Sequence, residues 1–233
     1  MRAGRCGARG SAPADGAETG LRLSVPLRTA PGVEYREFDI AASLGRAHGH
    51  LLSVDLRNPK VSVDLLYPGA VGARARVSAM ARARGAVGAV DGDFFNITET
   101  QHPGIKATGA PVGPAIAGGR VLKAAVPDGR RFGPALPPRT ITRDVIGVGI
   151  ANGGRRLLLA LDGGPAYRTG LTLAELAQVM RSLGSRDAFS LDGGGSSTLV
   201  ARLPGVTALG VVNHPSGGAE RAVPNGIGVF SWG

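Results

Sequence analysis

Cysteine is almost absent from this chain. Cys6 is the only one, so neither an intrachain disulfide nor a cysteine-based metal site can form. Lysine is also scarce, since Lys60, Lys106 and Lys123 are the only ones, and arginine carries most of the net charge of +10. The arginines are scattered, and aromatic residues make up only 4% of the chain, so few could stack bases. We therefore expect a solvated basic surface and no nucleic-acid partner.

Long apolar runs are missing as well. No run is long enough to span a membrane, and residues 1–30 contain no apolar core of a secretory signal. These 30 residues also lack periodicity, which predicts a disordered arm. Residues 31–233 are expected to form a single domain, because the chain is 43% hydrophobic and long enough to bury a core. Its 38 glycines and 16 prolines indicate many turns and short strands.

Two segments share one order of elements: a helix, a glycine, a short apolar strand and an acidic loop. The first has a helix over 74–84 and a strand over 86–90. The second has a helix over 172–183, with Thr172 and Glu175 placed for a capping box, and a buried strand over 188–191. Strands that follow helices in this way are usually neighbours in one sheet. We expect an α+β fold with a mixed sheet and two main helices, and both acidic loops at one edge.

Further strands are indicated by apolar residues, which alternate with polar ones in residues 52–56 and 61–65. Residues 52–56 and 61–65 predict a hairpin or strand pair with one buried face. Residues 145–150 and 156–161 predict a second pair, joined by a turn at 152–154, and 227–230 a final strand. Asp162 follows the 156–161 strand, so it either joins a site or caps a turn.

The most informative stretch is Leu191-Asp-Gly-Gly-Gly-Ser-Ser-Thr-Leu199. Three glycines allow positive φ angles and a close approach by a ligand, and they aim N–H groups into a concavity suited to an anion. The three hydroxyl groups that follow can donate and accept hydrogen bonds. An acid at a strand end beside an anion cradle is typical of a binding or catalytic site. The alternative is a sharp turn in which Asp192 caps its own backbone.

Carboxylates and cations elsewhere extend this interpretation. Asp91 or Asp93 would face Asp192 across a cleft, and paired carboxylates are what glycosidic cleavage requires. Arg221 could bind a phosphate through two parallel hydrogen bonds. His214 is either a proton shuttle or a surface residue. A His-Gly-His run, His48 to His50, could ligate a metal, although the sequence shows no third ligand nearby.

Five blocks in order make the chain resemble the phosphodiester glycosidase family. They are Asp91-Gly-Asp-Phe-Phe-Asn96, Gly109-Ala-Pro-Val-Gly113, Gly170-Leu-Thr-Leu-Ala-Glu-Leu-Ala177, Leu191-Asp-Gly-Gly-Gly-Ser-Ser-Thr198, and Asn213-His-Pro-Ser216 with Glu220-Arg221 and Pro224-Asn225. Members of this family remove a sugar attached through a phosphodiester and leave a phosphomonoester. The resemblance implies Asp192 and Asp93 as catalytic carboxylates. It implies these substrate-binding residues: Asp91, Asn96, Gly193, Gly194, Gly195, Ser196, Ser197, Thr198, Asn213, Arg221 and Asn225.

The resemblance also implies a sugar-phosphate glycan as substrate, no cofactor, and a secreted or cell-envelope location. Two departures from the family pattern favour reduced activity: about three dozen residues separate Gly113 from Gly149, and Gly164 stands where the family often has arginine. Two other function classes stay open. One is a non-catalytic glycan- or phosphate-binding module. The other is a metal-dependent phosphodiesterase, in which a divalent cation would be held by Asp91, Asp93 and Asp192.

Overall fold

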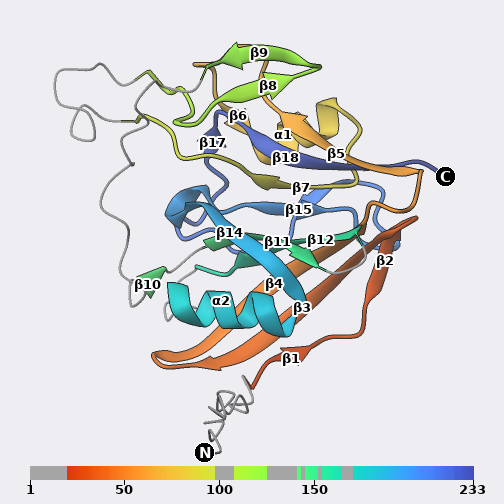
Figure 1. The fold of residues 1–233 in the computed structure, drawn as a ribbon, viewed down its shortest axis with the longest axis vertical. Helices are drawn as coiled ribbons and strands as arrows, with labels where there is room; N and C mark the ends of the chain where they lie inside the picture. Colours follow the sequence, from red (N-terminus) through yellow and green to blue (C-terminus); the bar gives the residue numbers. More distant parts are fainter. Residues whose placement is uncertain (1–19, 98–107, 125–140, 143–144, 152–153, 164–169) are drawn as a thin grey trace, which may run out of the picture.

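The computed structural model describes residues 20–97, 108–124, 141–142, 145–151, 154–163 and 170–233. In these parts the chain is mostly β-structure with two α-helices (Figure 1). Two large sheets form the layers of the fold, and all strand pairs within the described residues are antiparallel. None of the described helices is long and apolar enough to cross a membrane.

The first sheet has seven strands in the order β1-β3-β4-β12-β11-β14, with β2 also paired to β3. These strands are β1 (Arg22–Leu23), β2 (Leu27–Ala30), β3 (Val33–Ala42), β4 (Gly45–Asp55), β11 (Val145–Ala151), β12 (Arg155–Leu161) and β14 (Ser185–Gly193). Helix α2 (Leu173–Ser182) covers one face of this sheet (Figure 1). Its buried Leu176, Val179 and Met180 pack in a cluster with Phe38 and Leu51 of the sheet.

The second sheet has five strands in the order β16-β15-β7-β18-β5. They are β5 (Val61–Leu66), β7 (Gly88–Asp91), β15 (Leu199–Ala201), β16 (Gly210–Val211) and β18 (Gly226–Ser231). Helix α1 (Val77–Ala83) packs beside it. Three small pairs complete the fold: β6 (Ala75–Arg76) with β17 (Ala222–Val223), β8 (Ala115–Ala117) with β9 (Arg120–Lys123), and β10 (Ile141–Thr142) with β13 (Leu171–Thr172).

The main core lies between the two large sheets. Tyr35, Leu52 and Val54 of the first sheet pack there in one cluster with Val90 and Leu199 of the second. Because side chains alternate along a strand, the residues of β4 at positions 48, 50, 52 and 54 share this inner face. The polar side chains of His48 and His50 therefore also face the second sheet.

Both predicted helices are present. α2 has the predicted capping box: the Thr172 hydroxyl accepts from the Glu175 N–H at 3.1 Å, and the Thr172 N–H donates to Glu175 Oε2 at 2.7 Å. α1 begins at Val77, later than the predicted start at 74, because residues 75–76 pair with β17. Gly85 follows its C-terminus with φ +70°, as expected for a helix-terminating glycine.

The predicted sheet organisation needs correction. The strands that follow the two helices, β7 and β14, lie in different sheets rather than side by side in one mixed sheet. β14 is an edge strand instead of a buried one, and Phe189 in it is 54% exposed. The reason is the connection: each helix packs on its own sheet, so neither acts as a crossover between parallel neighbours.

Two other predictions also change. Residues 61–66 do not pair with residues 45–55, since β4 pairs with β3 and β12 while β5 pairs with β18. Residues 22–30, predicted within a disordered arm, form β1 and β2 on the edge of the first sheet. Residues 1–19 and the turn residues 152–153 lie outside the described residues. The predicted pairing of 145–150 with 156–161 is confirmed by β11 and β12.

Candidate active site

The two acidic segments meet although their strands belong to different sheets. Asp192 lies near the end of β14, and its backbone N–H donates to the Gly92 carbonyl at 3.0 Å. Gly92 directly follows β7 of the second sheet, so this bond joins the ends of the two layers. Asp93 is close enough to Asp192 for its charge to act on the Asp192 pKa. The pairing that the sequence suggested is therefore produced by sheet-on-sheet packing.

Asp192 is linked to a cation through a hydroxyl group. The Ser196 hydroxyl donates to the Asp192 carboxylate and accepts from Arg221 Nη1 at 3.3 Å. Burial raises the pKa of Asp192, and this rise is partly offset by hydrogen bonds from Ser196 and Gly193 and by the charge of Arg221. A carboxyl group with a raised pKa beside an arginine can hold a proton next to a bound anion.

Asp93 is held in place mainly by backbone groups. Its own N–H donates to Asn225 Oδ1 at 2.9 Å, and its Oδ2 accepts from the Gly113 N–H. Burial raises the pKa of Asp93, and the Gly113 bond and the charge of Lys123 act in the opposite direction. Gly113 ends the block Gly109-Ala-Pro-Val-Gly113, one of the five that carry the family resemblance.

The glycine run forms a single 3₁₀ turn, Gly194–Ser196. Gly194 has φ +62°, a conformation that costs glycine little. Gly195 lies against Arg221: a Cβ at this position would be 2.5 Å from Arg221 Nη2. Arg221 therefore lies directly beside the glycine run, and its Nη1 donates to the hydroxyl group of the buried Ser196. The turn and the adjacent Arg221 are here called the cradle.

Asp91 does not reach this cradle. It is fully buried, its Oδ1 accepts from the Thr198 N–H at 2.8 Å, and its Oδ2 has no partner within the described residues. Burial raises the pKa of Asp91 well above its usual range, and nearby Asp192 adds to the rise. Asp91 therefore lies inside the protein, where it joins the end of β7 to the segment that follows the glycine run.

Several predicted substrate ligands are likewise occupied within the protein. Asn213 accepts from the Leu199 N–H at 2.8 Å and donates to the Ser197 carbonyl at 2.9 Å. Asn225 Oδ1 accepts from the Asp93 N–H, and the Thr198 hydroxyl donates to the Ser196 carbonyl at 3.1 Å. All are buried, as are Ser197 and Asn96, and the Asn96 backbone bonds to residues 109 and 110. These residues hold the loops in place. Ser196 is fully buried as well, whereas Asp93, Asp192, Gly194, Gly195 and Arg221 keep exposed surface.

Asp162 ends the strand β12 on the same sheet edge as Asp192, with β11 between their strands. It is not a simple turn cap. Its Oδ1 lies 3.0 Å from His50 Nε2 and accepts from the His214 N–H at 2.6 Å, and His214 Nδ1 lies 3.1 Å from its Oδ2. Burial opposes ionisation, but the hydrogen bonds from His50 and His214 outweigh it and lower the pKa of Asp162.

The alternative of a three-aspartate metal site is not supported by the geometry. In the described part of the chain, the only three metal-ligating side chains with donor atoms within 4.8 Å of one another are His48, His50 and Asp162. Asp91, Asp93 and Asp192 do not form such a group. Binding of a divalent cation by these three carboxylates stays a prediction.

Two contributors were missed in the sequence. Lys123, at the end of the β8–β9 hairpin, donates from Nζ to the carbonyls of Val112 and Gly113 at 2.7 and 3.1 Å, which positions the Gly113 N–H against Asp93. Glu220 accepts from the Ser78 N–H and hydroxyl at 2.7 and 2.6 Å, and so caps α1, whose N-cap Arg76 makes no side-chain cap. Neither partnership has a local sequence signal, because each spans loops joined only by folding.

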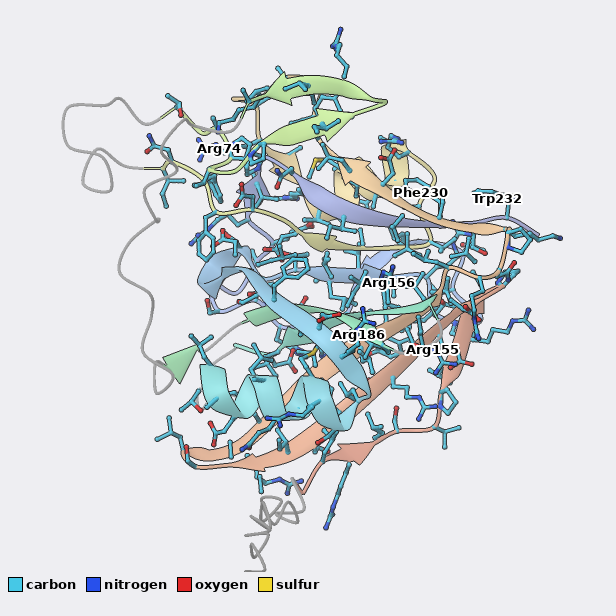
Figure 2. All side chains as sticks on the ribbon, in the orientation of Figure 1. Arg74, Arg155, Arg156, Arg186, Phe230 and Trp232 are labelled. Atoms are coloured by element: carbon cyan, nitrogen blue, oxygen red, sulfur yellow. The ribbon has the colours of Figure 1, made fainter. Side chains whose placement is uncertain are left out.

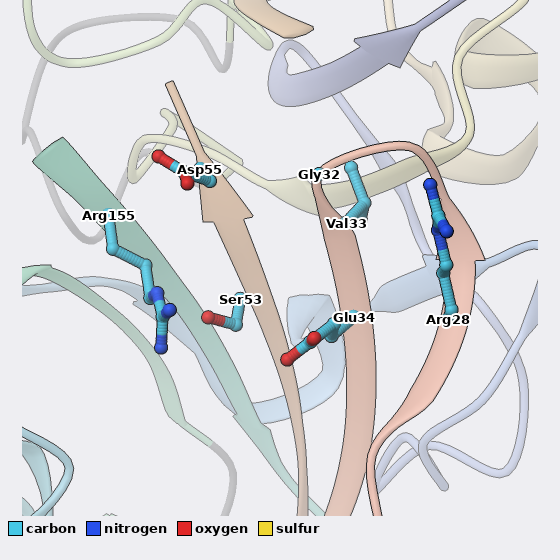
Figure 3. A pocket seen from close by; sticks show the side chains of 7 residues that line it. All are labelled: Arg28, Gly32, Val33, Glu34, Ser53, Asp55 and Arg155. Atoms are coloured by element: carbon cyan, nitrogen blue, oxygen red, sulfur yellow. The ribbon is translucent and has the colours of Figure 1, made fainter. Parts of the chain in front are cut away.

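The remaining surface features lie apart from this site. Figure 2 shows Arg155, Arg156 and Arg186 at the starts of β12 and β14, the opposite ends of these strands from Asp162 and Asp192. Near this end, a hollow of about 250 Å³ is lined by Arg28, Gly32, Val33, Glu34, Ser53, Asp55 and Arg155 (Figure 3). Its positive and negative side chains balance, and it contains none of the predicted site residues.

A second hollow, of about 330 Å³, borders the site. It is lined by Val211, Asn213, His214, Pro215, Gly218, Ala219 and Glu220. Its lining includes Asn213, which is hydrogen-bonded to Ser197 and Leu199, and Glu220, which precedes Arg221.

Fold and site together define a two-sheet protein with carboxylates at strand ends beside an anion cradle. The resemblance to the phosphodiester glycosidase family is confirmed, because the family model matches residues 136–230. This range includes Asp162, Asp192, the glycine run and Arg221, whereas Asp93 and Gly113 precede it. No curated protein matches the chain.

Solved structures share the fold at low sequence identity. A hypothetical protein from Synechocystis is 14% identical with a TM-score of 0.64; the alignment covers 91% of this chain but only 64% of that one. The catalytic domain of zebrafish N-acetylglucosamine-1-phosphodiester α-N-acetylglucosaminidase, auto-inhibited by its pro-peptide, is 17% identical with a TM-score of 0.58, over 91% of this chain and 88% of that one. A Burkholderia pseudomallei protein inferred to be exported is 14% identical with a TM-score of 0.67, over 98% of this chain and 100% of that one.

Proposed function

We propose that this protein hydrolyses the glycosidic bond of a sugar phosphodiester, similar to an N-acetylglucosamine-1-phosphodiester, and releases the free sugar and a phosphomonoester. One observation carries the proposal: Asp93 and Asp192 come together from two sheets, and Arg221 is tied to Asp192 through Ser196. The family match supports the reaction class. The substrate class follows from the pairing of carboxylates with an anion cradle.

The geometry suggests a role for each carboxylate. Asp192 lies on the side of Arg221, so it faces the phosphate, and its raised pKa favours the protonated form that could protonate the leaving oxygen. Asp93 would face the sugar, where it attacks or stabilises the anomeric carbon or activates water. Water supplies the hydroxyl group of the released sugar, and its proton replaces the one given to the phosphate.

Positive charge at the phosphate is as important as acid catalysis. A phosphate monoester is already a good leaving group, so stabilising its developing charge lowers the barrier more than protonation alone. We propose that Arg221 and the backbone amides of Gly194, Gly195 and Ser196 do this. We propose a glycan or cell-envelope polymer as substrate and an exported or envelope location, which the Burkholderia relative supports.

Product analysis tests the proposal. The wild type is incubated with an α-N-acetylglucosamine phosphodiester, beside Asp192→Asn, Asp93→Asn and the matched control Asp187→Asn. Asp187 is an exposed residue of the same strand as Asp192, paired with Arg186 away from the site. We expect free sugar and a phosphomonoester from the wild type and the control. Each site variant should lose about 10²- to 10⁴-fold in rate.

Three results would contradict this assignment. A sugar phosphate among the products would show cleavage of the P–O bond instead. Unchanged turnover by Asp192→Asn would remove that residue from the chemistry. No turnover by a folded wild type, together with retained binding of the phosphodiester, would favour the binding-module alternative.

A further inference from the structure

A second cluster of polar side chains lies on the inner face of the first sheet. His48 and His50 occupy alternate positions of β4 and so share the face that carries Leu52 and Val54. Asp162 directly follows β12, which pairs with β4 through Leu161 and Gly49. One ring nitrogen of each histidine and one carboxylate oxygen of Asp162 lie within 4.8 Å of one another.

Side chains of the neighbouring strand β3 contact Nδ1 of both imidazole rings. Asp39 is opposite His48 and Glu37 is opposite His50 in the register. His48 Nδ1 lies 3.1 Å from Asp39 Oδ1, and His50 Nδ1 lies 2.7 Å from the Tyr35 hydroxyl. Histidines that bind metals nearly always use their second nitrogen in this way, as donors to a carboxylate or another oxygen. Such bonds at Nδ1 leave Nε2 as the coordinating atom.

The hydrogen bonds of Tyr35 point to the same tautomer. Its hydroxyl lies 2.7 Å from His50 Nδ1 and 3.2 Å from Glu37 Oε1, and both can accept a proton, but the hydroxyl has only one to give. If His50 Nδ1 carries the hydrogen, it donates to Tyr35, and Tyr35 donates to Glu37. Nε2 of the same ring lies 3.0 Å from Asp162 Oδ1, so one cation can contact both atoms.

We propose that His48, His50 and Asp162 bind a divalent transition-metal ion, with Zn²⁺ as the best fit. Two imidazoles and one carboxylate form an N/O ligand set that suits zinc rather than Mg²⁺ or Ca²⁺. Ligand atoms around tetrahedral Zn²⁺ lie about 3.3 Å apart, so these donors need to close by at most about 1.5 Å. His48 is 21% exposed, whereas His50 and Asp162 are almost fully buried, so its side chain has room to move and marks the entry path.

Three protein ligands leave the fourth position of zinc open, as in catalytic rather than purely structural sites. The metal would also restrict the position of the Asp162 carboxylate, which accepts a hydrogen bond from the His214 backbone N–H. The adjacent Asn213 braces the glycine run. Metal binding at this site is independent of the proposed hydrolysis, because it uses neither Asp93 nor Asp192.

Metal binding can be measured directly on the full chain. The protein is stripped with a chelator, dialysed and titrated with Zn²⁺ alone by calorimetry at pH 7. We expect one Zn²⁺ per chain. His48→Gln should weaken binding by more than about 100-fold, and Asp39→Asn by about 10- to 100-fold, as for partners that orient a ligand. Co²⁺ in the same site should give visible absorption that His48→Gln abolishes.

The chain provides matched controls. His102 is its only histidine besides His48, His50 and His214, and Cys6 is its only thiol; His102→Gln and Cys6→Ser should bind Zn²⁺ as tightly as the wild type. Melting curves of the stripped proteins verify that each variant is folded. The proposal is wrong if the folded wild type binds less than one equivalent, or if His48→Gln and His102→Gln bind equally well.

Discussion

Replacing Gly195 by alanine separates the position of Arg221 from the stability of the fold. A Cβ at residue 195 would lie 2.5 Å from Nη2 and 2.9 Å from Cζ of Arg221. Non-bonded heavy atoms are most favourable at about 3.5–4.0 Å, so the guanidinium group must move by roughly 1 Å. Gly195 does not have a positive φ, so alanine introduces no backbone strain there.

The displacement should affect catalysis far more than folding. A reacting or charge-stabilising group misplaced by about 1 Å can cost about 100-fold in rate, equivalent to about 2.7 kcal/mol. The guanidinium is the mobile end of an exposed side chain, so stability should change by less than about 0.5 kcal/mol. For a chain of this size this corresponds to a Tm shift of no more than about 2 °C.

The assay compares kcat/KM on the sugar phosphodiester with the melting temperature for three variants. Gly195→Ala and Arg221→Ala should both lose activity while melting near the wild-type temperature. Gly210→Ala is the control, because a Cβ there meets nothing within 4 Å. If Gly195→Ala stays within about threefold of the wild type while Arg221→Ala is impaired, the position of the guanidinium is not limiting. If both stay active, Arg221 is not a phosphate ligand.

Three further predictions concern stability. Burial raises the pKa of Asp91 in the folded chain. The stability that Asp91 contributes is therefore fully present below its unfolded pKa of about 3.9 and is lost as the pH rises toward its folded pKa. The free energy of urea unfolding should thus depend less on pH between 4 and 8 in Asp91→Asn than in the wild type, and an unchanged dependence would contradict this. Glu220→Gln should lower the Tm by about 2–6 °C, since the cap on Ser78 at α1 is worth about 1–2 kcal/mol, and calorimetry with no shift would exclude the cap. Thr172→Ala should cost about 1 kcal/mol by removing the capping box of α2, whereas equal urea midpoints would show that the box is not stabilising.

Local signals identified the elements better than their partners. The capping box at Thr172 and Glu175, the helix-ending glycines and the apolar run in residues 157–161 are properties of short segments, and the structure contains each of them as a cap, a helix end or a strand. The pairing of β5 with β18 depends on residues about 160 positions apart. A short apolar strand has no local feature that selects a distant partner, so the predicted hairpin of residues 52–65 was wrong.

The candidate site divides in the same way. The sequence indicated Asp93, Asp192, the glycine run and Arg221, because acids at strand ends and consecutive glycines are visible in the chain. It also indicated Asp91 as a ligand, whereas burial makes this residue internal. Exposure is a property of the packed molecule, so neighbouring acids with the same local pattern acquired different environments.

The sequence by itself determined the elements, the acids that end them and the resemblance to phosphodiester glycosidases. Only the tertiary structure decided that β7 and β14 belong to different sheets and still bring Asp93 to Asp192. It also brought Asp162 to His48 and His50, which lie more than one hundred residues earlier in the chain. The physical reason is that side-chain periodicity acts within a segment, whereas the packing of one sheet on another joins segments that share no local interaction.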